Sequence, residues 1–154
     1  MKTNAMRILE ELKIDYTTLS YTVDPQKLDA IHAAKELGID PERLFKTIVM
    51  INDSREIFVF CVPAPYEISL KKIRSLTSSK NIDLVKLSDL QKLTGYIRGG
   101  CSPLGMTHKY TTYIEESALI YDRVYVSAGV RGTMLCLKPE ELAAASRAEF
   151  ESLI

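Results

Sequence analysis

The sequence predicts an α+β fold, and two observations support that prediction. Runs of strand-forming residues alternate irregularly with helical patterns, without the strict strand–helix–strand repeat of a doubly wound sheet. The chain has 154 residues, of which 46% are hydrophobic and 26% charged, an ordinary composition for a globular domain. A chain of this length buries about 68–70% of its unfolded surface. We therefore expect residues 1–154 to form a single domain that needs neither a disulfide nor a metal to fold.

The N-terminal half is expected to hold three helical segments and three strands. The first helical segment follows Thr3, which can cap it. The second spans residues 26–37 and ends at Gly38, and the third is a short turn that begins at Pro41. Alternating or β-rich runs predict strands over 16–21, 45–51 and 56–62. The last two flank a polar stretch and are expected to pair as a hairpin.

The C-terminal half is expected to hold three more helices and four more strands. Helices are predicted over 69–76, 88–95 and 139–150. Ser69 is expected to cap the first, and Ser88 and Gln91 to form a capping box at the start of the second. The strands are predicted over 82–87, 111–114, 123–127 and 133–137, the last two joined by a turn at 128–132.

The charges are unevenly distributed, although the net charge is zero. Residues 71–109 contain eight Lys or Arg and two Asp, which gives this segment a net charge of +6. Two interpretations stay open: a basic face that attracts phosphates, or separate solvated helix faces. No apolar run approaches the roughly 20 residues that span a membrane, and the N-terminus lacks a secretory signal, so we expect a cytoplasmic protein.

Cysteine and histidine usage predicts neither a metal site nor a cofactor. The three cysteines, Cys61, Cys101 and Cys136, are widely spaced, and the chain has only two histidines. Cys61 and Cys136 lie in strand-like runs and are expected in the core.

A glycine-rich stretch at residues 95–105, the glycine loop, is the strongest candidate for a binding site. It contains Gly95, Gly99, Gly100 and Gly105. Paired glycines let the backbone approach a ligand closely, and successive N–H groups can hold an anion or a polarised carbonyl. The alternative is a tight structural turn that uses glycine for its conformational freedom.

Lys46 is the second candidate. It falls within the predicted strand 45–51, both faces of which are apolar. A buried ammonium is costly unless it reaches water, a partner or a ligand. The alternative is a strand-end lysine that extends to solvent or blocks pairing at a sheet edge.

Three segments occur in order along nearly the whole chain and carry a family resemblance: Phe45-Lys46-Thr47, the glycine loop, and residues 127–132, Ser-Ala-Gly-Val-Arg-Gly. Together they resemble the YbaK family of bacterial free-standing aminoacyl-tRNA deacylases, in particular its Cys-tRNA(Pro) deacylase branch. That family is related to the editing domain inserted in bacterial prolyl-tRNA synthetase. The resemblance implies a mixed, mostly antiparallel sheet curled toward a barrel, with helices outside.

The resemblance also implies a substrate and a site. The substrate would be the acceptor end of a mischarged aminoacyl-tRNA, foremost Cys-tRNA(Pro), whose own thiol attacks the ester. Prolyl-tRNA synthetase would be a partner. The implied catalytic residues are Lys46, Gly99, Gly100 and Ser102; the implied substrate-binding residues are Tyr21, Phe45, Thr47, Ser127 and Gly129; weaker tRNA contacts are expected from Lys71, Lys72, Arg74 and Arg98.

Cys101 has two possible roles. Because Arg98 and His108 are near in sequence, it qualifies as a nucleophile activated by a base or a positive neighbourhood. The alternative is a small hydrophobic residue of the loop. The resemblance favours the second role, since the family usually has an aliphatic residue here.

Three departures from the family pattern keep other functions open. Ala128 replaces a frequent glycine, Val130 a common lysine, and Met134 an aspartate of related deacylases. One alternative is a deacylase for another small amino acid, alanine or serine, on tRNA. The other is a tRNA- or nucleotide-binding module without catalysis.

Overall fold

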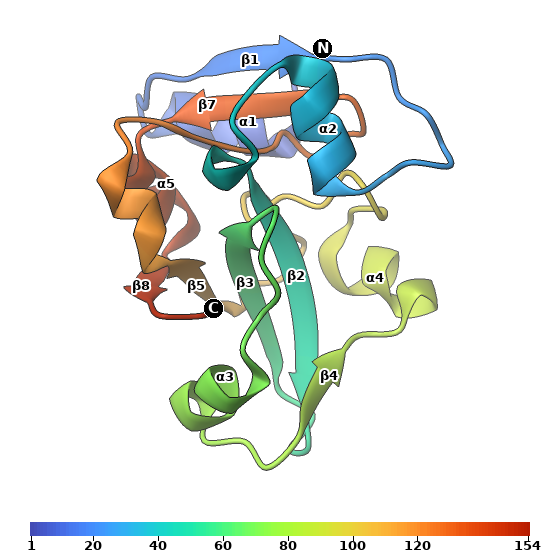
Figure 1. Cartoon of the computed structure of the whole chain (residues 1–154), viewed down its shortest axis with the longest axis vertical. Coiled ribbons are helices and arrows are strands. Elements are labelled where there is room, and N and C mark those ends of the chain that lie inside the picture. The colour runs from blue at the N-terminus through green and yellow to red at the C-terminus, as the bar shows by residue number, and fades with distance from the viewer.

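The computed structural model describes all residues, 1–154, and its strands form two sheets (Figure 1). The strand at 111–115 pairs in parallel with those at 57–63 and 149–151, and the other four strand pairings are antiparallel. The three-stranded sheet has the order β1 (Thr17–Ser20), β7 (Thr133–Leu137), β6 (Val124–Ser127); the five-stranded sheet has the order β4 (Ile82–Leu84), β2 (Phe45–Asn52), β3 (Ile57–Pro63), β5 (Thr111–Glu115), β8 (Glu149–Glu151).

These pairings confirm an α+β fold with mostly antiparallel strands. The two sheets meet where β2 begins, through an isolated bridge between Leu44 and Tyr125. Because no continuous ladder joins them, the strands do not close into a barrel.

Five α-helices of eight residues each flank the sheets. They are α1 (Asn4–Glu11), α2 (Ala30–Leu37), α3 (Leu70–Thr77), α4 (Leu87–Thr94) and α5 (Pro139–Ser146); short 3-10 helices span Pro41–Arg43 and Glu116–Ile120. The predicted caps at Thr3 and Ser69 are confirmed, since each side chain accepts a backbone N–H in the first turn. None of these helices has the length and apolar character needed to cross a membrane.

Two helix starts were predicted incorrectly. Helix α2 begins at Ala30 rather than at residue 26, because the Asp29 side chain accepts the His32 N–H and so starts the helix there. Helix α4 begins at Leu87, and its N-cap Lys86 makes no capping bond through its side chain. The capping box predicted for Ser88 and Gln91 is therefore wrong.

Two other boundaries also differ from the prediction. Strand β4 ends at Leu84, because helix α4 begins three residues later. Helix α5 ends at Ser146, where Arg147 adopts a left-handed backbone conformation with φ 56°. The chain then forms β8, in which Phe150 pairs with Ile114 of β5. A tertiary pairing, absent from the local pattern, converts the predicted end of the helix into a strand.

The core has separate parts at the two ends of the β2–β3 hairpin. Helices α1 and α5 pack on the three-stranded sheet and on Phe45 at the start of β2. Helix α3 packs through Ile73 against Met50, Phe58 and Ile82, near the turn of the hairpin. A third, smaller cluster packs α2 beside the start of β2. Figure 1 shows α2 and α3 at opposite ends of β2.

Candidate active site

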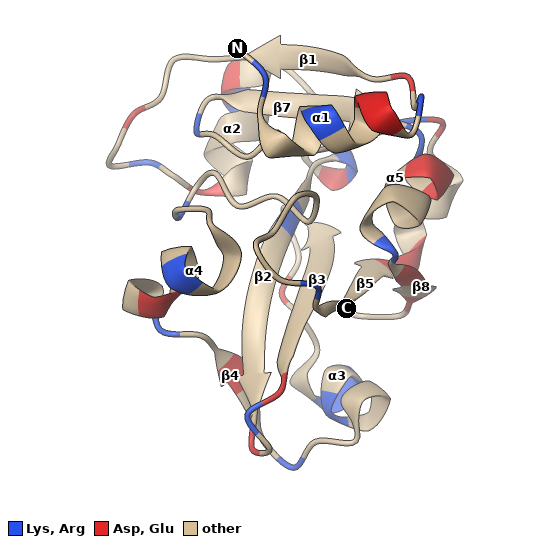
Figure 2. Cartoon of the chain, turned by 180° about the vertical axis from the view of Figure 1, so that it is seen from behind, with Lys and Arg blue, Asp and Glu red and all other residues tan.

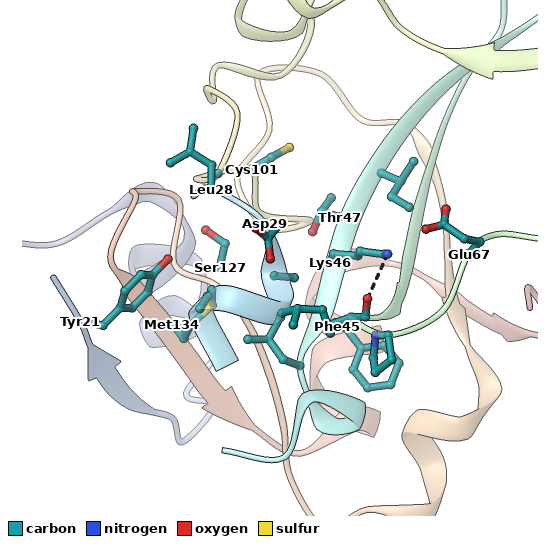
Figure 3. A pocket seen from close by; sticks show the side chains of 18 residues that line it. Tyr21, Leu28, Asp29, Phe45, Lys46, Thr47, Glu67, Cys101, Ser127 and Met134 are labelled. Atoms are coloured by element: carbon teal, nitrogen blue, oxygen red, sulfur yellow. Dashed lines mark hydrogen bonds between the residues drawn. The ribbon is translucent and has the colours of Figure 1, made fainter. Parts of the chain in front are cut away.

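A cavity of about 450 Å³ lies where the start of β2 meets α2, the glycine loop and the ends of β6 and β7. Figure 3 shows side chains from these segments converging on it. Tyr21, Phe45, Lys46, Thr47, Gly99 and Ser127 are the predicted site residues that line this cavity. Segments from widely separated parts of the chain, between residues 21 and 134, thus contribute to one site.

Lys46 is the only basic residue in the cavity lining. It is the second residue of β2 and is half-buried. Its Nζ donates a hydrogen bond to the Ala64 carbonyl oxygen, 3.1 Å away, as drawn in Figure 3. The neighbouring Phe45 is fully buried in the core and anchors this end of the strand. The ammonium is therefore held at the cavity by a single backbone carbonyl.

The glycine loop reaches the cavity through Gly99, whose φ of +84° favours glycine. The Gly99 N–H has no acceptor within the chain, whereas the Gly100 N–H donates to the Ile97 carbonyl at 2.9 Å. Gly100 lies outside the lining and abuts the 128–132 turn, where a Cβ would come 3.0 Å from the Arg131 nitrogen. The Gly100 N–H is thus committed to a turn, in contrast to the expectation that it faces an ester.

Arg131 ties the two loops together. Its Nε donates to the Arg98 carbonyl at 2.8 Å, and its Cγ packs near Gly99. The position of Gly99 therefore depends on the 128–132 turn.

Ser102 and Gly129 also lie outside the cavity lining. Ser102 is fully buried, and its Oγ accepts the Leu104 N–H at 3.3 Å, so its hydroxyl stabilises the loop. Gly129 has a φ of +99°, and a Cβ there would come 2.8 Å from the Tyr96 ring. Its N–H donates to Ser127 Oγ at 3.1 Å, which leaves the Ser127 hydroxyl hydrogen free for a ligand.

Comparison with known proteins identifies the family. The family model of the aminoacyl-tRNA editing domain matches residues 24–145. A protein of Enterococcus faecalis that is assigned as a Cys-tRNA(Pro)/Cys-tRNA(Cys) deacylase, EbsC, is 38% identical over 152 residues, covering 99% of this chain and 93% of the relative. The chain belongs to the aminoacyl-tRNA editing domain family. It is an editing enzyme that deacylates aminoacyl-tRNA, as the sequence predicts.

Solved structures agree with the fold of this editing domain. A trans-editing enzyme for prolyl-tRNA synthetase superimposes with a TM-score of 0.81 at 21% identity, covering 99% of this chain and 98% of that one. A protein described only as hypothetical superimposes with a TM-score of 0.88 at 18% identity, covering 98% and 99%.

Cys101 lines the cavity of the editing domain but lacks the surroundings of a nucleophile. Burial raises the pKa of its thiol to about 11, so the thiol stays protonated at neutral pH. His108 lies in a different groove, between α1 and α5, and stacks edge-on against Tyr110. The structure thus separates His108 from Cys101 and agrees with the role of a small loop side chain.

The predicted tRNA-contacting residues lie outside the cavity lining. Lys71, Lys72 and Arg74 belong to α3, which Figure 2 shows with blue but no red residues at the hairpin-turn end of the sheet. Lys72 is also tied to the C-terminus, since its Nζ donates to Ser152 Oγ at 2.7 Å. Arg98 is exposed in the glycine loop next to Gly99.

Sequence reasoning missed two acidic residues that line the cavity, Asp29 and Glu67. The signal for Asp29 was available, because aspartate is a preferred N-cap residue and a helix was expected around it. Glu67 follows the proline-containing break after β3, where the sequence has no periodic pattern. No group of three or more His, Cys, Asp or Glu side chains is arranged to hold a metal ion.

Proposed function

We propose that this editing domain deacylates Cys-tRNA(Pro) and that the substrate's own thiol is the nucleophile. The observation that supports this most directly is a cavity with a cation and a free backbone donor but without an activated enzyme nucleophile. The one thiol in the lining, Cys101, has a pKa of about 11. The similarity to the Enterococcus protein assigned as a Cys-tRNA(Pro)/Cys-tRNA(Cys) deacylase favours the same substrate.

In this mechanism the cysteinyl sulfur, as a thiolate, attacks the carbonyl carbon of its own ester. The bond between that carbon and the tRNA 3′-oxygen breaks, and the 3′-oxygen takes a proton from water as tRNA leaves. Water then opens the resulting thiolactone to release cysteine. The reaction needs no redox partner and no acyl-enzyme.

The residues of the cavity act by positioning and by electrostatic stabilisation. The Lys46 ammonium and the Gly99 N–H stabilise the developing oxyanion, for which one donor is typically worth about 3–4 kcal/mol. Ser127 and Tyr21 orient the aminoacyl group from the ends of β6 and β1, and Phe45 and Thr47 complete the β2 wall. The other loop residues, Gly100, Ser102 and Gly129, act indirectly by holding the two loops together.

The acceptor stem is proposed to lie along the basic residues Arg98, Lys71, Lys72 and Arg74. Because phosphate contacts release counterions, binding of tRNA should weaken steeply with salt. Neutralising Lys71 and Arg74 together is expected to reduce the slope of log K against log salt by about 2. An unchanged slope would remove α3 from the tRNA footprint.

Prolyl-tRNA synthetase is the proposed partner, and the cytoplasm the proposed compartment. A domain of this size has little surface for reading tRNA identity, so a complex with the synthetase would supply it. Co-purification of the two proteins on charged tRNA(Pro), compared with tRNA of another identity, tests the association.

The deciding experiment is single-turnover deacylation of Cys-tRNA(Pro), Ala-tRNA(Pro) and Ser-tRNA(Pro) side by side. The proposal expects rapid loss of the cysteinyl ester alone, because only that substrate carries a thiol. Cleavage of the alanyl or seryl ester instead would assign a mechanism driven by water or a hydroxyl. Binding without cleavage of any ester would leave a non-catalytic binding module.

A further inference from the structure

Asp29 places a carboxylate at the cavity without a charged partner. Its side chain points into the cavity in Figure 3. One carboxylate oxygen, Oδ1, accepts the His32 N–H at 2.8 Å and thereby caps α2. Asp29 takes part in no ion pair of the chain, so the second oxygen remains available to a donor.

The charges of the cavity favour a cationic group near Asp29. The lining carries two carboxylates, Asp29 and Glu67, and one ammonium, Lys46, which gives it a net charge of −1. Lys46 Nζ points toward the loop that carries Ala64 and Glu67 (Figure 3), so that side already has a cation. The other side has the carboxylate but no cation.

Asp29 is exposed at the edge of the cavity, and Tyr21 gives a second indication that its charge acts on the lining. Burial raises the pKa of Tyr21, a hydrogen bond with the Gly132 backbone partly offsets this, and the negative charge of Asp29 adds a smaller increase. The carboxylate is therefore close enough for its charge to act on another side chain of the lining. Met134, which also lines the cavity, contributes no charge.

We propose that Asp29 binds the α-ammonium group of the aminoacyl ester, an inference that rests on the proposed function. A protonated α-amino group presents N–H donors to the free carboxylate oxygen, and the negative charge of that carboxylate favours the protonated form. With the ammonium on Asp29, the ester carbonyl lies between α2 and Lys46. The enzyme then distinguishes esters with a free amine from N-acylated ones, such as formylated or peptidyl esters.

The test compares Cys-tRNA(Pro) with N-acetyl-Cys-tRNA(Pro) in wild type and Asp29→Asn. Asparagine keeps the helix cap and removes only the charge, so the variant is expected to fold. Because acetylation changes the ester's intrinsic reactivity, each rate is divided by that of spontaneous hydrolysis. Asp29→Asn is expected to slow cleavage of the free-amine substrate by roughly 10- to 100-fold. Its rate on the acetylated substrate is expected to stay within about threefold of the wild-type rate.

Two control variants isolate the position of the charge. Glu36→Gln removes a carboxylate from the same helix, outside the cavity, and is expected to leave both rates unchanged. Glu67→Gln removes the other carboxylate of the lining. If Glu67→Gln, rather than Asp29→Asn, abolishes the preference for the free-amine substrate over the acetylated one, the assignment to Asp29 is overturned. Equal losses on both substrates in Asp29→Asn would overturn it too.

A binding measurement separates this inference from the proposed function. Calorimetry would compare a non-hydrolysable 3′-alanylamido adenosine with its analogue that lacks the α-amine. The amine is expected to tighten binding to wild type by about tenfold and to have no effect on Asp29→Asn. If wild type cleaves no ester, the proposed reaction fails while this comparison still decides the role of Asp29. No effect of the amine on wild type would reject that role.

Discussion

Replacing Gly100 with alanine tests whether the contact between the two loops sets the active site. The added methyl would lie 3.0 Å from the Arg131 nitrogen and 3.1 Å from the Val130 carbonyl carbon. Carbon atoms pack at about 3.5–4.0 Å, so the glycine loop must retreat from the 128–132 turn by roughly 0.5 Å. Overpacking of this kind costs about 1–3 kcal/mol of the free energy of unfolding.

The retreat would displace Gly99, which lines the cavity and whose N–H has no acceptor within the chain. Since a misplacement of about 1 Å costs on the order of 100-fold in rate, half of that shift is expected to cost about tenfold. The melting temperature should fall by about 2–4 °C for each kcal/mol lost.

The assay is single-turnover deacylation of Cys-tRNA(Pro), with thermal unfolding measured in parallel. Gly38→Ala is the matched control: Gly38 has a φ of +66°, but a Cβ added there would meet no atom within 4 Å. Alanine there costs about 1–2 kcal/mol through its left-handed conformation and leaves the cavity untouched. A Gly100→Ala enzyme as active as Gly38→Ala would refute the reasoning.

Three further predictions follow from individual side chains. Lys46→Met keeps the aliphatic stem and is expected to reduce the single-turnover rate by about 100- to 1,000-fold; a loss below about threefold would exclude Lys46 from the reaction. Cys101→Ala is expected to retain activity within about threefold, because a thiol with a pKa of about 11 is not a nucleophile at neutral pH; an inactive but folded variant would contradict this. Burial raises the pKa of Cys61 from 9.0 to about 12, so the unfolded chain loses this proton at lower pH than the native one. The free energy of unfolding should therefore fall as the pH rises from 9 toward 12. Denaturant titrations at several pH values should show a shallower fall in Cys61→Ala, by up to about 1.4 kcal/mol per pH unit. Tyr96, with a pKa of about 12, adds the same pH dependence to wild type and Cys61→Ala. If the free energy of unfolding fell equally steeply with pH in both proteins, the role of Cys61 would be refuted.

Several parts of the site could be predicted before the fold was known. Lys46 stood out because an ammonium within a strand apolar on both faces needs a partner, and the structure places it beside the cavity. Gly99 was found through the paired glycines of its loop. Cys101 was interpreted as a small loop side chain, and its burial and the placement of His108 in a different groove agree with that interpretation.

Other assignments depended on side-chain direction, which local patterns do not encode. Gly100 and Ser102 belong to the same loop as Gly99, yet one has its N–H bound to Ile97 and the other is fully buried. Which loop residue faces the cavity is decided by packing against the distant 128–132 turn. Asp29 was missed because the predicted helix began too early and placed it within the helix rather than at its cap.

The sequence by itself determined the helices with strong local signals, the central hairpin and the family. Those features rest on interactions between neighbours: caps, alternation and turn residues act within a few positions of the chain. Only the tertiary structure decided that the strands form two sheets, that residues 149–151 pair with β5, and that a carboxylate joins Lys46 at the cavity. Each of these depends on segments distant in sequence, and their contacts arise only when the hydrophobic core brings them together.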